Sequence, residues 1–88
     1  MSAMYSLSYN SRAIKNLKSI HPQDQRKVLS MLKLLVVSPK EPSLHIKKLI
    51  QTQHGFRLRV GKVRVIFDVD HKARKIHVWD IDYRGNIY

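Results

Sequence analysis

The chain has 88 residues, and its 17 Lys and Arg against 6 Asp and Glu give a formal net charge of +11 at pH 7. This length predicts one domain over residues 1–88, with a small hydrophobic core. Cysteine is absent, which excludes disulfides and thiolate metal sites. The charge favours a polyanionic partner, whether RNA, DNA, anionic lipid or an acidic protein, without choosing among them.

Signals for targeting and for cofactors are lacking. Met1 opens no charged-then-apolar signal pattern, and the longest apolar stretch, 34–37, is far below the ~20 residues that span a bilayer. None of the histidines shows metal-ligand spacing such as HExxH. We therefore expect a cytoplasmic protein that associates with no membrane and needs neither a metal nor a small-molecule cofactor.

The first half of the chain predicts a strand followed by two helices. Residues 5–9 alternate between apolar and polar side chains, as in a half-buried strand. Asn10 or Ser11 can cap the first helix, and Pro22 suits the first turn of the second. Pro39 forces the residue before it out of helical geometry and ends that helix. The positions at helical spacing are Ala13, Ile14, Leu17, Ile20, Val28, Leu29, Leu32, Leu35 and Val36.

The second half predicts strands, because the apolar period changes from about 3.6 to 2 after Pro42. We expect strands over 43–50, 54–60, 63–69 and 74–83, the last rich in Ile, Val, Trp and Tyr. The order is strand, two helices, then strands. It predicts an α+β fold in which the helices pack on one face of a largely antiparallel sheet.

The clearest local prediction is a hairpin within 54–67. Gly61 and Lys62 fit a two-residue type II′ turn, with Gly61 supplying the positive φ. Such a turn fixes the strand register, so Arg59 lies directly across from Arg64. Alternation then gives the core face the apolar side chains of both strands, which are Phe56, Leu58, Val60, Val63, Val65 and Phe67.

Arginines occupy the other face of this hairpin. Arg57, Arg59 and Arg64 project there, and no acidic residue occurs between Pro42 and Phe67 to neutralise them. Like charges placed opposite each other destabilise a sheet by up to about 1 kcal/mol, so a bound anion is favoured. Because guanidinium groups recognise phosphate in bidentate fashion, the hairpin predicts a phosphate site. The alternative is that these arginines only solvate an exposed face.

Three stretches resemble the RelE/ParE toxin superfamily: KKL at 47–49, RLRVGKVRVIF within the hairpin, and the terminal Tyr-Arg-x-x-x-Tyr at 83–88. The resemblance extends over nearly the whole chain and implies a curved antiparallel sheet backed by two helices. Within the superfamily it indicates the RelE branch. Such toxins cleave messenger RNA in the ribosomal A site, using the RNA 2′-OH as nucleophile and no metal. The implied partners are a cognate acidic antitoxin, the ribosome and mRNA.

The resemblance also implies roles for single residues. Arg59 and Arg64 are expected to stabilise charge on the scissile phosphate. Arg84 is expected to face the leaving 5′-oxygen, and Tyr88 to stack on a base or contact the attacking hydroxyl. The RNA-binding residues are expected to be Arg57, Lys47, Lys48 and Lys62.

One part of the mechanism stays open at this point. Relatives often carry Lys at the positions of Arg57 and Arg59, and arginine stays protonated, so neither serves as an ordinary general base. His54, just before the hairpin, is a further candidate because histidine titrates near neutral pH. Trp79 is expected in the core, whereas Tyr83 either packs in the core or stacks on a base.

Two other functions fit the same fold. One is a ParE-like toxin that poisons DNA gyrase without cutting RNA. The other is a non-catalytic domain that binds nucleic acid or an antitoxin. The arginine-bearing hairpin and the pair Arg84 and Tyr88 favour the endoribonuclease.

Overall fold

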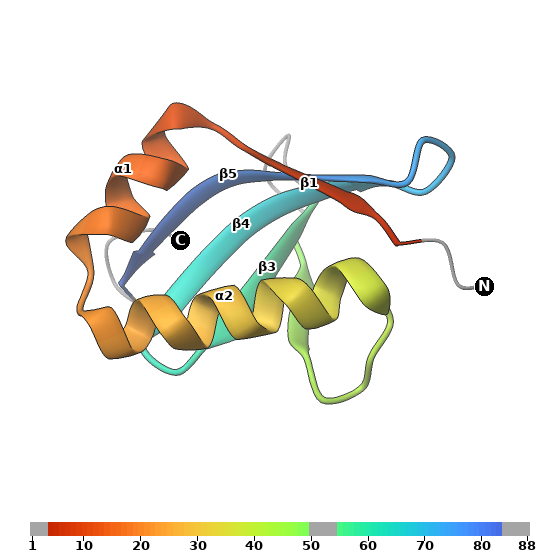
Figure 1. Ribbon diagram of the computed structural model, residues 1–88. Helices are drawn as coiled ribbons and strands as arrows, with labels where there is room; N and C mark the ends of the chain where they lie inside the picture. Colours follow the sequence, from red (N-terminus) through yellow and green to blue (C-terminus); the bar gives the residue numbers. More distant parts are fainter. Residues whose placement is uncertain (1–3, 50–54, 84–88) are drawn as a thin grey trace.

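The structure is a computed structural model that describes residues 4–49 and 55–83. Its elements in chain order are β1 (Ser6–Tyr9), α1 (Ser11–Ser19), α2 (Pro22–Val37), β2 (His45–Lys48), β3 (Phe56–Val60), β4 (Val63–Asp70) and β5 (Lys75–Tyr83). Figure 1 shows α2 running across the sheet, with β3, β4 and β5 behind it. Each expected element is present, and the strand bounds differ from the predicted ones by one or two residues at most ends.

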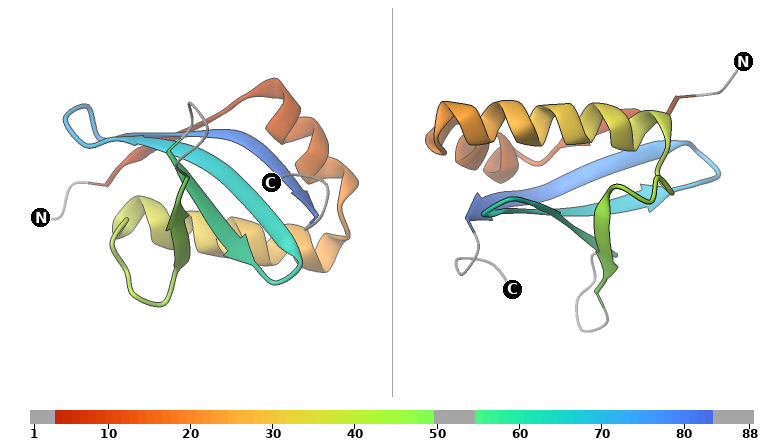
Figure 2. Two further views of the ribbon diagram at one scale, coloured as in Figure 1. Left: turned by 180° about the vertical axis from the view of Figure 1, so that it is seen from behind. Right: turned by 90° about the horizontal axis from the view of Figure 1, so that it is seen from below.

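The sheet has five strands in the order β1-β5-β4-β3-β2. β1 runs parallel to β5, and all other neighbours are antiparallel. Both helices cover the same face of this sheet, as the right-hand view of Figure 2 shows, and leave the opposite face uncovered by helices. The predicted α+β fold is therefore confirmed.

Helix boundaries follow local chemistry. The side chain of His21 accepts a hydrogen bond from the backbone N–H of Gln23 (3.1 Å), which caps α2 just before Pro22. α2 ends where the backbone N–H of Ser38, the residue before Pro39, bonds the Leu34 carbonyl. These bounds agree with the prediction.

The cap of α1 differs in detail from the prediction. Asn10 occupies the N-cap position, but its side chain makes no capping hydrogen bond. The Asn10 amide instead donates to the backbone carbonyl of Trp79 (3.4 Å). Tertiary contact with β5 therefore replaces the local cap at the start of α1.

The core lies between the helices and the sheet. Its most deeply buried side chains are Ala13, Val28, Leu32, Leu35, Leu58, Val63, Val65, Phe67, Ile76, Val78 and Ile81. Ile14 and Leu29 were expected in the apolar stripes, but each is 40% exposed, so that part of the prediction is wrong. Helical spacing shows which side of a helix is apolar. Contact with the sheet decides how many residues on that side are buried.

A β-bulge lies between β4 and β5. Ile66 pairs with Asp80 and Phe67 pairs with Val78, so Trp79 is the extra residue. The bulge lets Val78 and Ile81, three positions apart, both point into the core. Trp79 is only partly buried and is not packed against the core, so its expected core position is wrong. The alternation of side chains between the two faces of β5 is interrupted at the extra residue, so alternation alone could not place Trp79.

The turn at Gly61 gives a first testable prediction. Gly61 has φ +58°, and a Cβ added there meets no atom within 4 Å, so the cost of a side chain is conformational alone. We expect Gly61→Ala to lower the free energy of unfolding by about 1 kcal/mol. Gly61→Asn should cost less, because Asn tolerates left-handed backbone. Urea unfolding of both variants measures this difference, and equal stability of the Ala variant and the unaltered chain would contradict it.

Tyr9 gives a second prediction, at high pH. It lines a groove of 330 Å³ between β1 and α2, where burial raises the pKa of its phenol above the usual value of 10.0. As the pH rises through 10.0, the Tyr9 phenol ionises in the unfolded chain before it ionises in the folded one. The free energy of unfolding is therefore unaffected below that pH and decreases above it. Titration of phenolate absorbance should show a late step that Tyr9→Phe removes. The control Tyr5→Phe should retain the late step; its loss there would contradict the assignment.

Candidate functional site

The predicted hairpin is present with the predicted register. Val60 pairs with Val63 and Arg59 pairs with Arg64 across a turn in which Gly61 alone has positive φ. Positive φ at the first turn position only is the pattern of a type II′ turn. The turn therefore fixes which side chains share a face of the sheet.

Strand pairing extends this register beyond the hairpin. His45 pairs with Arg59, Arg59 with Arg64, and Arg64 with Asp82, so one row crosses β2, β3, β4 and β5. Lys47 pairs with Arg57 in the next row on the same face. Neighbouring strands lie about 4.8 Å apart, so this row is a short ladder of charged side chains.

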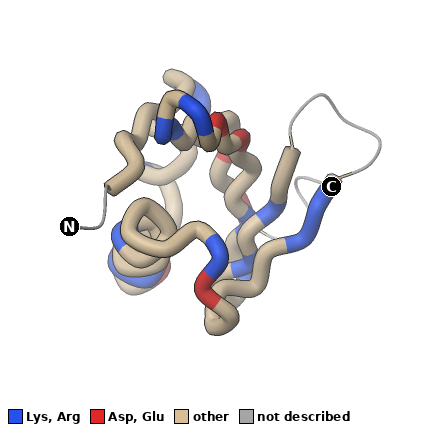
Figure 3. The backbone as a smooth tube through the Cα atoms, turned by 90° about the vertical axis from the view of Figure 1, so that its right-hand side faces the viewer, with Lys and Arg blue, Asp and Glu red and all other residues tan. Residues whose placement is uncertain are grey.

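The basic side chains of these rows surround a pocket of 330 Å³. It is lined by Leu44, His45, Ile46, Lys47, Arg57, Arg59 and Arg64. Among the described residues, this lining contains no carboxylate. In Figure 3 several basic positions lie at the right, away from the helix that is seen end-on at the left. The geometry is that of an open cationic pocket built on paired strands.

The arginines differ in exposure. Arg59 is exposed, whereas Arg57 and Arg64 are partly buried. In the described part of the chain, Arg57 and Arg59 have no ion-pair partner. Their guanidinium donors therefore remain available for an external anion.

The remaining predicted RNA-binding residues lie outside this pocket. Lys48 pairs with Phe56, which places it on the other side of β2 from Lys47. Lys62 is exposed in the β3–β4 turn and does not line the pocket. Arg84, Tyr88 and the further candidate His54 fall outside the described residues. The structure therefore brings Lys47, Arg57, Arg59 and Arg64 together.

His45 is the residue of this pocket that the sequence analysis missed. It is exposed on β2 and faces Arg59 on β3. Its spacing of two residues from Lys47 was a signal that both share a face. The register of β2 against β3 was needed to place that face beside the arginines, because the β2–β3 connection is too long to read as a tight turn.

Asp68 joins three segments at the other end of the arginine-bearing face. Its carboxylate accepts hydrogen bonds from the backbone N–H of Gly55 and from the indole N–H of Trp79 (2.6 Å). The Trp79 ring makes an edge contact with His77, which is hydrogen-bonded to Ser8 (2.7 Å). These contacts hold the start of β3, which carries Arg57, against β4 and β5.

Tyr83 belongs to the scaffold. It packs against the core, and its hydroxyl donates to Asp24 (3.1 Å) and accepts from the backbone N–H of His21 (2.9 Å). These bonds tie the end of β5 to the start of α2. Of the two roles considered for Tyr83, the structure therefore supports the core role.

Among residues 4–49 and 55–83, no group of three or more His, Asp or Glu is placed to hold a metal ion. In the same part of the chain, no helix is long and apolar enough to cross a membrane.

Comparison with known proteins gives matches at the level of structure. Neither protein-family models nor curated protein sequences match the chain. The archaeal RelE–RelB complex from Pyrococcus horikoshii OT3 contains a similar chain, with a TM-score of 0.80 and 26% identity over 94% of this chain and 98% of that one. The toxin–antitoxin complex RelBE2 from Mycobacterium tuberculosis gives 0.78 and 19% over 93% and 100%. The isolated E. coli RelE toxin gives 0.75 and 16% over 92% and 85%.

These structures define a class of small toxins, several of them solved with an antitoxin. The chain therefore has the fold of the RelE-like toxins, in agreement with the sequence resemblance.

The contacts of Asp68 give a third prediction. Asp68→Ala leaves two partly buried donors without this acceptor, which should cost about 1–3 kcal/mol of unfolding free energy. Trp79 is the only tryptophan of the chain, so its fluorescence reports on the same change. We expect a red-shifted emission in Asp68→Ala.

The matched control is Asp70→Ala. Asp70 is exposed and accepts a hydrogen bond from the backbone N–H of Ala73 in the β4–β5 turn, away from Trp79. Its tryptophan emission should stay unchanged. Identical emission spectra for Asp68→Ala and the unaltered chain would contradict the role given to Asp68.

Proposed function

We propose that the chain is the toxin of a type II toxin–antitoxin pair and acts as a metal-independent endoribonuclease. It would cleave messenger RNA in the ribosomal A site and so stop translation. The observation that carries this proposal is the cationic pocket on the β3–β4 hairpin of a RelE fold, where Arg57, Arg59 and Arg64 meet Lys47. A pocket of 330 Å³ whose described lining residues include no carboxylate suits a phosphodiester.

The pocket suits cleavage by the RNA's own 2′-hydroxyl. Attack of this oxygen on phosphorus gathers negative charge on the phosphoryl oxygens as the bond to the 5′-oxygen breaks. Arg59 and Arg64 occupy paired positions on the β3–β4 hairpin, so their places in the sheet are fixed before the substrate arrives. Preorganised cations of this kind stabilise developing charge without reorganisation during the reaction. Arg57 and Lys47 would hold the neighbouring backbone.

Arg84 and Tyr88 keep the roles that the sequence resemblance gave them. Arg84 would face the leaving 5′-oxygen, and Tyr88 would stack on a base or contact the attacking hydroxyl. Lys48 and Lys62, which lie outside the pocket, would contact more distant phosphates of the messenger RNA or the ribosome. Surface lysines of this kind add affinity without selecting a sequence.

An acidic antitoxin is the proposed protein partner. The solved relatives from Pyrococcus horikoshii and Mycobacterium tuberculosis are complexes of a toxin with its antitoxin. The net charge of +11 favours an acidic partner, and a protein that arrests translation in its own cell requires one. The proposed site of action is the cytoplasm, where translating ribosomes are found.

The fourth prediction tests the arginine pair. In a cell-free translation system, we expect the chain to produce messenger RNA ends that primer extension maps to the A-site codon. Arg59→Ala and Arg64→Ala should each lower the cleavage rate by about 100- to 1,000-fold, the usual effect of removing one group that stabilises transition-state charge. In cells, either change should relieve growth arrest while antitoxin binding is retained.

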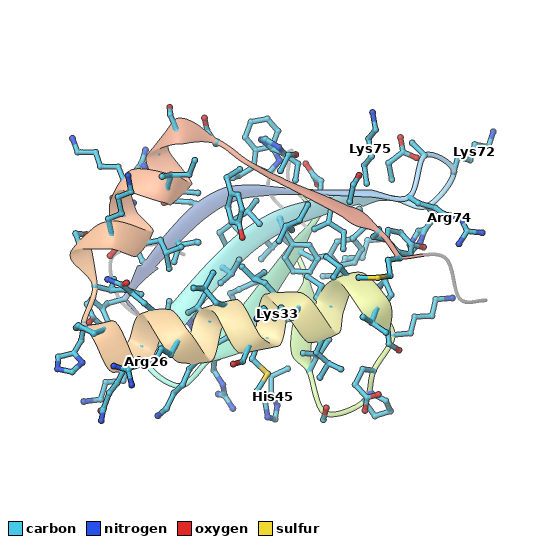
Figure 4. The ribbon with its side chains drawn as sticks, in the orientation of Figure 1. Arg26, Lys33, His45, Lys72, Arg74 and Lys75 are labelled. Carbon is cyan, nitrogen blue, oxygen red and sulfur yellow. The ribbon has the colours of Figure 1, made fainter. Side chains whose placement is uncertain are left out.

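The matched control is Arg26→Ala, which removes the same charge from the exposed surface of α2. In Figure 4, Arg26 lies on the helical side of the molecule. Its cleavage rate should equal that of the unaltered chain. Full toxicity of both pocket variants would overturn the site, whereas intact messenger RNA with inhibited gyrase supercoiling would favour the ParE-like alternative. Inactivity in both assays would favour a non-catalytic binding domain.

A further inference from the structure

The arginines of the pocket do not account for one step of the proposed reaction. Attack by the RNA 2′-hydroxyl requires a group that accepts its proton, and arginine stays protonated in proteins. Among the described residues of the lining, Lys47 is the only other cation, and a lysine ammonium has donors but no acceptor. The remaining described side chain of the lining with an ionisable group is His45.

The position of His45 suits proton transfer at this site. It is the first residue of β2 and pairs directly with Arg59, whose other neighbour in the row is Arg64. Directly paired side chains have Cβ atoms about 5 Å apart, within reach of one phosphate group. Figure 4 shows the imidazole projecting at the lower margin of the molecule, clear of α2.

The order of the row matches the geometry of the reaction. In-line displacement places the attacking and leaving oxygens on opposite sides of phosphorus. A phosphate held above Arg59 has His45 on one side and Arg64 on the other. The attacking hydroxyl then faces an imidazole, while Arg59 and Arg64 contact the phosphoryl oxygens.

We infer that His45 is the general base that takes the proton of the RNA 2′-hydroxyl. The inference rests on the proposed function and adds a catalytic residue to it. Neutral imidazole accepts the proton as the bond between the 2′-oxygen and phosphorus forms. The bond from phosphorus to the 5′-oxygen breaks with its electron pair, and the 5′-oxygen takes a proton from water. The imidazolium gives its proton to the resulting hydroxide, so the products are a 2′,3′-cyclic phosphate and a 5′-hydroxyl.

The residues around His45 allow pH dependence to distinguish proton transfer by His45 from charge stabilisation by its neighbours. The charged groups that line the pocket with it are Lys47 on its own strand, Arg57 and Arg59 on β3 and Arg64 on β4. As side-chain types, lysine and arginine act as cations at neutral pH, whereas imidazole is the type best suited to exchange a proton there. A dependence of the cleavage rate on pH near neutrality is therefore a signature of the imidazole within this pocket.

The fifth prediction concerns the role of His45. The single-turnover cleavage rates of the unaltered chain and of His45→Gln are measured on ribosomes carrying a defined A-site codon. The rate of the unaltered chain should rise with pH across about 5–8, because the neutral imidazole is the reactive form. His45→Gln should be about 100-fold slower or more at neutral pH, with a flat profile in that range. Binding to ribosomes, measured by co-sedimentation, should not change. Added imidazole should partly restore cleavage by His45→Ala.

The matched control is His71→Gln, in the turn between β4 and β5 at the opposite end of β4 from Gly61. This variant should keep both the rate and the pH profile. An unchanged rate and profile in His45→Gln, with the unaltered chain cutting normally, would overturn the role of His45 alone. Failure of the unaltered chain to cut any messenger RNA would overturn the proposed function, and the role of His45 with it.

Discussion

The pairing of Arg59 with Arg64 across a two-residue turn is the constraint on which the candidate site depends. Two like charges in direct opposition destabilise the bare hairpin, so the apolar face of the same strands has to hold it together. That face supplies Leu58, Val63 and Val65, all fully buried beneath the helices. The hydrophobic effect on one side of the sheet thus keeps the cations close together on the other.

This division between the two faces explains how a chain of 88 residues accommodates both a core and a charged site. The helices cover only one face, and short strands alternate between the two environments. Under strict alternation after Val78, Ile81 would point to the arginine-bearing face. The bulge at Trp79 shifts the alternation by one residue, so Ile81 points into the core. Trp79 then becomes available to bond Asp68 on the arginine-bearing face.

The hairpin was predictable in full because its determinants are local. Gly61 permits positive φ, the turn has two residues, and the alternation of apolar and basic residues continues on both strands. The position of His45 was not predictable in the same way. The register of β2 comes from contact with β3 across a connection of several residues, and no turn motif in the sequence fixes it.

The sequence by itself determined the order of elements, the ends of α2, the register of the β3–β4 hairpin and the clustering of Arg57, Arg59 and Arg64. These features depend on backbone preferences and alternation over a few residues, which can be read from neighbours in the chain. Only the tertiary structure decided that His45 and Lys47 complete the pocket, that Lys48 faces away from it, and that Trp79 leaves the core. Those outcomes depend on the register between strands that are distant in sequence and on the position of a β-bulge. Neither can be read from a few neighbouring residues.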